Sequence, residues 1–325
     1  MAVAFAIARP PGVRAAEGAD RYLGVAALAE TADHANLDAP VVRARLDVRS
    51  VGTRDRLLDI SESLGGSVLR DYAVEMTKTM HLIAISGDFS TFAHLHPALD
   101  VTGHLRVVFH APKSGRYHFY ADASPATLGQ RVFRFDVPVA FGDLDAAGHS
   151  RALAHPARVR LAPTPLVARA DDYTVTLSPA SGRDRKRRAT LDAKATSFVR
   201  VAIVKDGRLA TDLHPYLGNV AHAVFINAAS LAYVHVHPVA GDLLAAPTPH
   251  RPAPPTSTMP TMPAIPGMPG MAMGVMAMPA LRASDPVPAV MTLAVDALPR
   301  GTYKLWLQFA GGGSLHVAPF VLVAR

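Results

Sequence analysis

HLIAISGDFSTFAHLHP, at residues 81–97, recurs in altered form as HAVFINAASLAYVHVHP at residues 222–238. In both stretches one histidine is followed, after the same spacing, by a His-x-His-Pro motif. Self-similarity at a fixed offset is the signature of an internal repeat. Each stretch also contains two runs of β-branched and aromatic residues around a short turn, a pattern typical of a β-hairpin. The sequence therefore predicts two copies of one β-rich unit.

The repeat continues on both sides of these hairpins. Gly66 corresponds to Gly207 in the same register, and Gly115-Arg-Tyr117 corresponds to Gly301-Thr-Tyr303 after an insertion in the second copy. Short strand-like runs separated by Gly, Pro and Asp turns at regular spacing favour β-sandwiches. We expect an all-β fold of two tandem immunoglobulin-like antiparallel β-sandwiches that arose by internal duplication.

Composition along the chain suggests where these units begin and end. The expected divisions are an Ala-rich lead-in at 1–40, a first sandwich at 41–140, a linker at 141–165 and a second sandwich at 166–325. An insertion at 241–288 is rich in Met and Pro, and such low-complexity sequence is expected to be flexible. Short helices are expected only at 25–30 and 53–58.

The absence of cysteine among the 325 residues excludes several classes of chemistry. Disulfides, thiolate metal sites, cysteine nucleophiles and blue-copper centres all require cysteine. The 15 His and 11 Met, together with the carboxylates, are the side chains left for metal binding. No Ser-His-Asp arrangement, paired-carboxylate signature or Gly-rich phosphate loop stands out, so we expect no enzyme of those classes.

The formal charge of +7 does not indicate a nucleic-acid partner, because residues 1–140 hold equal numbers of basic and acidic side chains. Much of the excess comes from one short run, RDRKRR at 183–188, without aromatic residues or a recognition helix beside it. No stretch approaches the roughly 20 apolar residues of a transmembrane helix. The apolar run at 2–8 is a poor signal peptide because no Lys or Arg precedes it.

The repeated histidines are candidate metal ligands. Residues two apart in a strand point to the same face, so the two histidines of each His-x-His motif share a face. A two-residue hairpin loop places His81 opposite His94, and a four-residue loop places it opposite His96; either register puts all three imidazoles on one side of the sheet. The predicted ligands are His81, His94 and His96 in the first copy and His222, His235 and His237 in the second. Alternatively, these histidines pack at a strand end and hydrogen-bond to the backbone.

The insertion adds thioethers to this ligand set. Seven methionines occur in a segment without charged residues, namely Met259, Met262, Met268, Met271, Met273, Met276 and Met278. Thioether is a soft ligand that favours Cu(I), whereas imidazole suits Cu(II), Zn and Ni. Copper is therefore the favoured ion, with zinc as the alternative. The other interpretation of the segment is a low-complexity linker without a ligand.

The same residues resemble a family of bacterial, mainly actinobacterial, exported proteins whose function is little characterised. The resemblance rests on Met80-His81-Leu82 with His94-Leu-His96-Pro97, then on Asp212–Gly218, His222 and Leu231–Pro238. It covers roughly 57–137 and 173–325 and also extends to YtkA-like domains, which are immunoglobulin-like modules of the bacterial envelope. The resemblance implies a location in the envelope and heavy-metal binding. The poor signal peptide and the long Met-rich insertion depart from the family pattern.

Together these observations predict a non-catalytic metal-binding protein, periplasmic or secreted, that buffers copper or hands it to a copper-transfer partner protein. The alternative is a structural or protein-interaction module without metal. A copper enzyme is less favoured. Multicopper oxidases need a cysteine and more His-x-His pairs, and copper/zinc superoxide dismutase normally has a disulfide and a bridging histidine.

Overall fold

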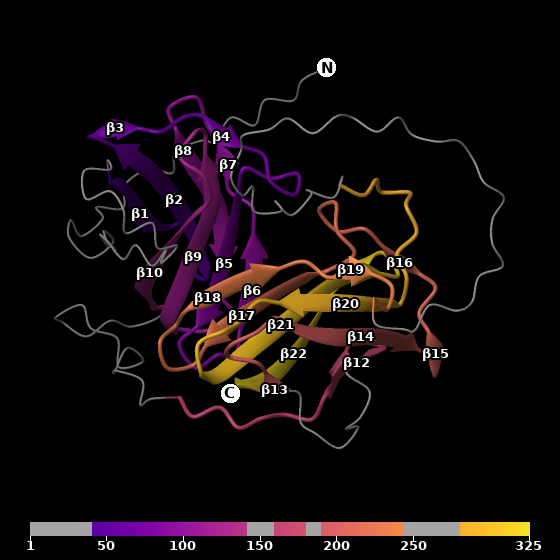
Figure 1. Ribbon diagram of the computed structural model, residues 1–325. Helices are drawn as coiled ribbons and strands as arrows, with labels where there is room; N and C mark the ends of the chain where they lie inside the picture. The colour runs from indigo at the N-terminus through magenta and orange to yellow at the C-terminus, as the bar shows by residue number, and fades with distance from the viewer. Residues whose placement is uncertain (1–40, 142–158, 180–189, 244–279) are drawn as a thin grey trace, which may run out of the picture. The chain divides into compact units, whose positions relative to one another are not determined.

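The computed structural model describes residues 41–141, 159–179, 190–243 and 280–325, and the chain divides into two compact units near residue 158 (Figure 1). Unit 1 comprises strands β1 to β10, and unit 2 comprises strands β11 to β22. Each unit contains two β-sheets, and the described residues include no α-helix. The expected all-β, duplicated sandwich fold is confirmed.

Unit 1 is a sandwich of two five-stranded sheets. The first sheet has the order β1 (Val42–Ser50), β2 (Asp55–Leu64), β8 (His104–His110) and β7 (Ala98–Leu99), with β3 (Ser67–Val68) paired to β2. The second sheet has the order β10 (Arg131–Val139), β9 (Gly115–Pro125), β5 (Met80–Ser86) and β6 (Phe92–Leu95), with β4 (Tyr72–Ala73) paired to β9. Apolar side chains from both sheets form one core between them.

Unit 2 repeats this plan with two six-stranded sheets around a second core. One sheet has the order β11 (Val167–Ala170), β12 (Tyr173–Pro179), β14 (Ser197–Lys205), β20 (Val290–Val295) and β19 (Val239–Ala240), with β15 (Arg208–Leu209) paired to β14. The other has the order β13 (Thr190–Leu191), β22 (Ser314–Ala324), β21 (Gly301–Gly311), β17 (His222–Asn227) and β18 (Tyr233–Val236), with β16 (Leu213–His214) paired to β21. Among the described strands, β13 and β22 form the one parallel pair.

The two units match strand for strand in the sheets that carry the histidines. The order β10-β9-β5-β6 in unit 1 corresponds to β22-β21-β17-β18 in unit 2. The insertion of unit 2 lies between β19 and β20, at the place where residues 100–103 turn from β7 to β8 in unit 1. Residues 244–279 of the insertion lie outside the described part, so its expected flexibility stays a prediction.

A tyrosine near the start of β9 and of β21 explains why the Gly-x-Tyr motif occurs in both copies. The hydroxyl of Tyr117 donates to the carbonyl of Lys113 at 2.9 Å, and that of Tyr303 donates to the carbonyl of Pro299 at 2.8 Å. This bond to the backbone four residues upstream resembles the tyrosine corner of immunoglobulin-like folds. The glycine of the motif has φ of 152° in unit 1 and 155° in unit 2, a conformation that favours glycine.

The prediction of a short helix at 53–58 is wrong, because strand β2 begins at Asp55 and continues to Leu64. Strand β2 pairs with both β1 and β8, and its alternate residues Leu58 and Ile60 are buried in the core. Pairing on both edges and burial on one face override a weak local helical preference. The helix expected at 25–30 lies outside the described residues. Within the described ranges, the structure contains no helix of the length and apolarity that a membrane span requires.

Candidate metal centre

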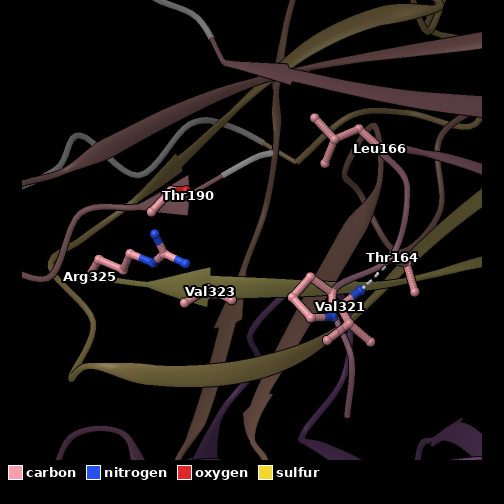
Figure 2. A pocket seen from close by; sticks show the side chains of 7 residues that line it. Thr164, Leu166, Thr190, Val321, Val323 and Arg325 are labelled. Atoms are coloured by element: carbon pink, nitrogen blue, oxygen red, sulfur yellow. Dashed lines mark hydrogen bonds between the residues drawn. The ribbon is translucent and has the colours of Figure 1, made fainter. Parts of the chain in front are cut away.

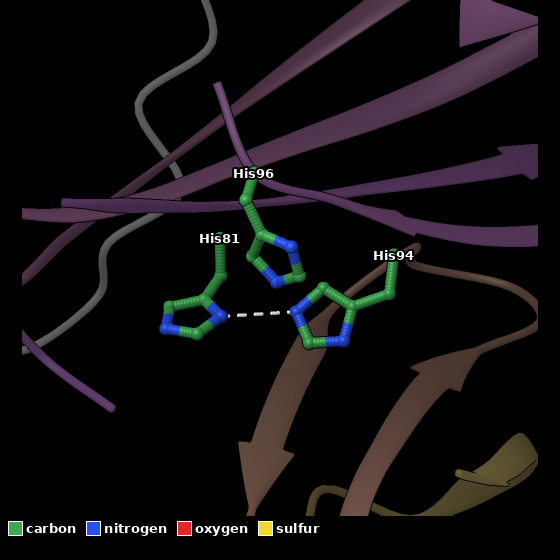
Figure 3. A group of neighbouring side chains, drawn as sticks. All are labelled: His81, His94 and His96. Carbon is green, nitrogen blue, oxygen red and sulfur yellow. Dashed lines mark hydrogen bonds between the residues drawn. The ribbon is translucent and has the colours of Figure 1, made fainter. Parts of the chain in front are cut away.

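The first histidine of unit 1, His81, lies on β5, which pairs with β9 on one side and with β6 on the other. Its neighbours Met80 and Leu82 point into the sandwich core, so His81 points to the opposite face of the sheet. The side chain is 4% exposed. Nε2 of His81 lies 3.1 Å from the carbonyl oxygen of Glu75, and Nδ1 lies 3.0 Å from Nε2 of His94 (Figure 3).

The other two histidines come from β6 and the residue that follows it. Leu82 pairs with Leu95, so His81 lies opposite His96, one residue beyond the end of β6. This is the register of the four-residue loop. His94 lies two residues earlier on the same face, and Figure 3 shows the three rings turned toward one another. The ring centroids are 4.7 to 5.3 Å apart.

Polar side chains at the end of the first hairpin strand hold this loop length in both units. In unit 1, the amide of Thr91 donates to Oγ of Ser86 at 3.0 Å. At the corresponding place in unit 2, Oδ1 of Asn227 accepts hydrogen bonds from the amides of Ala229 and Ser230. Side-chain acceptors of this kind replace backbone partners in tight loops. They therefore help to set the register that brings the histidines together.

Unit 2 reproduces the three-histidine group with the same atoms. Nε2 of His222 lies 3.0 Å from the carbonyl oxygen of Tyr216. Nδ1 of His222 lies 3.2 Å from Nε2 of His235 and 3.1 Å from Nε2 of His237. Ala223 pairs with Val236, so this hairpin has the same register as that of unit 1. We call the two groups triad 1 (His81, His94, His96) and triad 2 (His222, His235, His237).

Each triad has the geometry of a three-imidazole metal site. One ring nitrogen from each histidine of a triad lies within 4.8 Å of those of the other two. Three nitrogens bound to a tetrahedral ion at 2.0–2.1 Å would lie roughly 3.3 Å from one another. One N···N separation in triad 1, 3.0 Å, and two in triad 2, 3.2 and 3.1 Å, are close to that spacing. Each triad could therefore hold a metal ion with little movement of the rings.

The backbone carbonyl beside each first histidine selects the protonation state that a metal needs. A carbonyl oxygen only accepts, so Nε2 of His81 and of His222 carries the proton. In the neutral ring Nδ1 is then the unprotonated nitrogen, and it faces the other two histidines. A metal-bound imidazole commonly donates its second N–H to a carbonyl or carboxylate, which fixes the tautomer and the ring orientation. The same arrangement occurs in both units.

Triad 2 also has a tyrosine ring beside it. The rings of Tyr216 and His222 meet edge to face, with centroids 5.3 Å apart. Burial raises the pKa of the Tyr216 hydroxyl, which keeps it protonated at neutral pH. The phenol therefore packs against the first histidine as a neutral group, and the candidate ligands are the three imidazoles.

Comparison with known families places the triads in a repeated domain. The chain matches a domain of unknown function, DUF8832, at residues 42–140 and again at residues 168–268. The two matches together cover more than half of the 325 residues. The chain belongs to the DUF8832 family. No curated protein matches the sequence.

Each DUF8832 copy carries one triad, so the candidate site belongs to the repeated domain itself. The second match stops at residue 268, inside the insertion, whereas the first continues to residue 140 and includes β8 to β10. The structure shows that β20 to β22 complete the second sandwich as β8 to β10 complete the first. The second DUF8832 unit thus continues beyond the insertion that interrupts it.

The structure brings together the six histidines predicted from the sequence, in two separate groups of three. The seven predicted methionine ligands, at 259–278, lie outside the described residues. Sequence reasoning missed the carbonyl partners of the first histidines, which belong to Glu75 and Tyr216. Both residues stand six positions before the first histidine, so the repeat offers a signal for them. The repeat alone does not show which backbone groups face a ring.

Other histidines of this DUF8832 protein pair with aspartates outside the triads. His104 lies 2.6 Å from Asp59, and His118 lies 2.6 Å from Asp136. In unit 2, His316 lies 2.6 Å from Asp171. Each of these pairs consists of one imidazole and one carboxylate without a third convergent ligand in the described part of the chain. They therefore differ from the triads in kind.

A small pocket in unit 2 offers no alternative binding site for a metabolite (Figure 2). Thr164, Leu166, Val321 and Arg325 are among the residues that line it, and its volume is ≈ 10 Å³. A pocket of this size has room for about one water molecule. The triads, rather than this pocket, are therefore the sites with recognisable chemistry.

Proposed function

We propose that this DUF8832 protein is a non-catalytic metal-binding protein that buffers copper or hands it to a partner protein. The observation that supports the proposal most strongly is the repeated triad. In both units the first histidine has an unprotonated Nδ1, oriented by a backbone carbonyl, and two further imidazoles beside it. That Nδ1 lies 3.0 Å from one imidazole nitrogen in unit 1, and 3.2 and 3.1 Å from two imidazole nitrogens in unit 2. A histidine that only packs at a strand end has no need of two convergent imidazole neighbours.

The choice of copper rests on two kinds of ligand in one chain. Imidazole suits Cu(II), and it also suits zinc, the alternative ion for the triads. The seven methionines of the insertion supply thioethers, which favour Cu(I). Copper is the ion that both ligand sets accept. We propose that the triads bind Cu(II) and that the methionines bind Cu(I).

The proposed location is the bacterial envelope, either periplasmic or secreted. It is supported by the resemblance to exported proteins and YtkA-like domains, carried by the His-Leu-His-Pro and His-Val-His-Pro motifs. A protein that hands over copper also needs an acceptor protein, so a copper-transfer partner is part of the proposal.

The test is a metal titration of the full chain in its metal-free form. We expect about one Cu(II) or Zn(II) ion per triad, measured by competition with a chelator of known affinity. Replacement of His94, His96, His235 and His237 by Ala removes two ligands from each triad, so it should abolish both high-affinity equivalents. Binding weaker than micromolar in the unchanged chain, or binding unaltered by the four replacements, would contradict the proposal and favour a structural module.

A matched control separates the triads from histidines in general. The double variant His104→Ala/His110→Ala also removes two histidines from unit 1, where they pair with Asp59 and Asp55. This control variant should still bind two high-affinity divalent ions per chain, whereas His94→Ala/His96→Ala should bind one. Replacement of the seven methionines by Leu should lower the Cu(I) capacity and leave the divalent equivalents unchanged.

A further inference from the structure

The residue beside the first histidine differs in charge between the two triads. On β9, the cross-strand neighbour of His81 is Asp122, and on β21 the neighbour of His222 is Gln308. Both neighbours are 4% exposed. Directly paired residues of an antiparallel sheet have Cβ atoms about 4.5–5.5 Å apart and point to the same face. Triad 1 therefore has a buried carboxylate next to it where triad 2 has a neutral amide.

Contacts of Asp122 hold its carboxylate on this face of the sheet. The side-chain amide of Gln130 donates to Oδ1 of Asp122 at 2.8 Å. The negative charge of Asp122 is also one of the causes that raise the pKa of Glu62, a core residue of the same unit. The charge beside triad 1 is thus fixed in place by a hydrogen bond.

A second carboxylate near triad 1 has no counterpart at triad 2. Glu75, whose carbonyl accepts from His81, also accepts a hydrogen bond through its side chain from Ser124, two residues beyond Asp122 on β9. The residue that corresponds to Glu75 in unit 2 is Tyr216, whose ring is neutral. The surroundings of the two triads therefore differ by two acidic residues.

We propose that the triads are not equivalent, and that triad 1 is the tighter site for a divalent cation because Asp122 stabilises the bound charge. This inference rests on the proposed function, since it concerns the same metal sites. Coulomb energy is proportional to the charge of the ion, so the carboxylate stabilises a divalent ion twice as strongly as a monovalent one. Triad 2, with Gln308 in the same place, discriminates less between the two charges. Asp122 acts through the field at the site and is a positioning residue rather than a ligand.

The test compares Zn(II) with Ag(I), a redox-stable monovalent ion, on the full-length chain. Ring resonances of ¹⁵N-labelled histidine report each triad separately, so metal bound to methionine does not contribute. Residues that support a metal site from outside its ligand shell typically change affinity by about 10–100-fold. We expect triad 1 to bind Zn(II) more tightly than triad 2 by a factor in this range. Asp122→Asn should remove most of that advantage.

The ratio between the two ions separates a charge effect from a structural one. Asp122→Asn should weaken Ag(I) binding to triad 1 by only the square root of the Zn(II) effect, about 3–10-fold. A structural disturbance would weaken both ions equally. In unit 2, the isosteric change Gln308→Glu should strengthen Zn(II) binding to triad 2, which gives a second test if Asp122→Asn does not fold.

The outcomes also distinguish this inference from the proposed function. Equal Zn(II) affinities at the two triads, or an Asp122→Asn variant that weakens Zn(II) and Ag(I) by the same factor, would overturn the inference and leave metal binding intact. If neither triad binds Zn(II), Cu(II) or Ag(I), the proposed function is overturned together with the inference.

Discussion

Units 1 and 2 place three histidines on equivalent strands, yet they differ in the residues that surround them. Unit 1 has Glu62 and Tyr72 at positions where unit 2 has Ile203 and Leu213. All four side chains are buried. Unit 1 also has Asp122 where unit 2 has Gln308. One copy of the domain is thus polar at places where the other is neutral or apolar.

The comparison shows which features the triad needs. In both units Nδ1 of the first histidine lies 3.0 to 3.2 Å from Nε2 of the next histidine, and Nε2 of the first histidine faces the carbonyl six residues upstream, although the neighbouring charges differ. The geometry of the triad therefore depends on the hairpin register and on one backbone carbonyl. The residues around the triads can therefore differ in charge without changing this geometry, and we expect them to affect metal affinity and stability instead. Substitutions in the triads, in their surroundings and in the shared framework test these effects separately.

The largest effect is expected from His81→Gln and His222→Gln, each of which removes the anchored ligand from one triad. Apparent binding energies of about 10–16 kcal/mol for four-ligand zinc sites correspond to roughly 2.5–4 kcal/mol per ligand. Loss of one imidazole should therefore weaken Zn(II) binding at the changed triad by roughly a hundredfold to a thousandfold. Competition titration, with histidine ring resonances as the reporter, measures each triad by itself.

The unchanged triad of the same molecule is the control for this experiment. Its Zn(II) affinity should stay within a factor of about two or three of the original value, because independent sites are nearly additive. If either replacement weakens both triads equally, the idea of two separate sites that share one geometry is wrong.

The sequence alone predicts the fold class and the face on which the histidines lie. The period of two in strands such as β5 and the repeat around Gly-x-Tyr are enough for an all-β duplicated sandwich. The sequence does not decide between a two-residue and a four-residue hairpin loop, and therefore does not determine which histidine lies opposite the first one. In the four-residue loop, the side chains of Ser86 and Asn227 accept hydrogen bonds from loop amides. These bonds depend on a loop geometry that the sequence pattern does not specify.

Two other features could not be predicted because they depend on which strands become neighbours. Asp122 lies beside His81 only because β9 pairs with β5, and these residues are far apart in the sequence. The prediction of a helix at 53–58 is wrong for a similar reason, since the pairing of β2 with β1 and β8 determines the conformation of these residues. Local patterns describe a strand, whereas its partners are determined by the packing of the whole unit.

The next largest effect is expected at Glu62, which lies in the core of unit 1 where unit 2 has Ile203. Neither carboxylate oxygen of Glu62 has a hydrogen-bond partner among the described residues. Burial raises the pKa of Glu62 from 4.5 to about 7, with Arg131 opposing the change and Asp122 adding to it. The folded state therefore binds a proton more tightly than the unfolded state.

This shift fixes the direction of the pH effect on stability. Between pH 4.5 and 7 the folded chain holds more protons than the unfolded chain, so the free energy of unfolding of unit 1 falls as pH rises. By pH 8 the ionised carboxylate costs about 3 kcal/mol. Glu62→Gln and Glu62→Ile should each stabilise unit 1 at pH 8 and remove this pH dependence.

Chemical denaturation at pH 5 and pH 8 measures the effect, with NMR signals of unit 1 as the probe. Fluorescence of Trp306, the single tryptophan of the chain, follows unit 2 as an internal control. The transition of unit 2 should be the same with and without the Glu62 replacement. A Glu62→Gln variant that is no more stable than the original chain at pH 8 would contradict the assigned burial effect.

The smallest effect is expected at the two tyrosine corners, where the units are alike. Tyr117→Phe and Tyr303→Phe each remove one hydrogen bond to a backbone carbonyl, and such a bond contributes about 1 kcal/mol to stability. Each change should therefore lower the free energy of unfolding of its own unit by a similar amount. Tyr72→Phe is the matched control, because the Tyr72 hydroxyl is buried without a hydrogen-bond partner in the described structure and its removal should cost nothing. A large difference between Tyr117→Phe and Tyr303→Phe would show that the divergence of the two units extends from the surroundings of the triads to the framework of the sandwich.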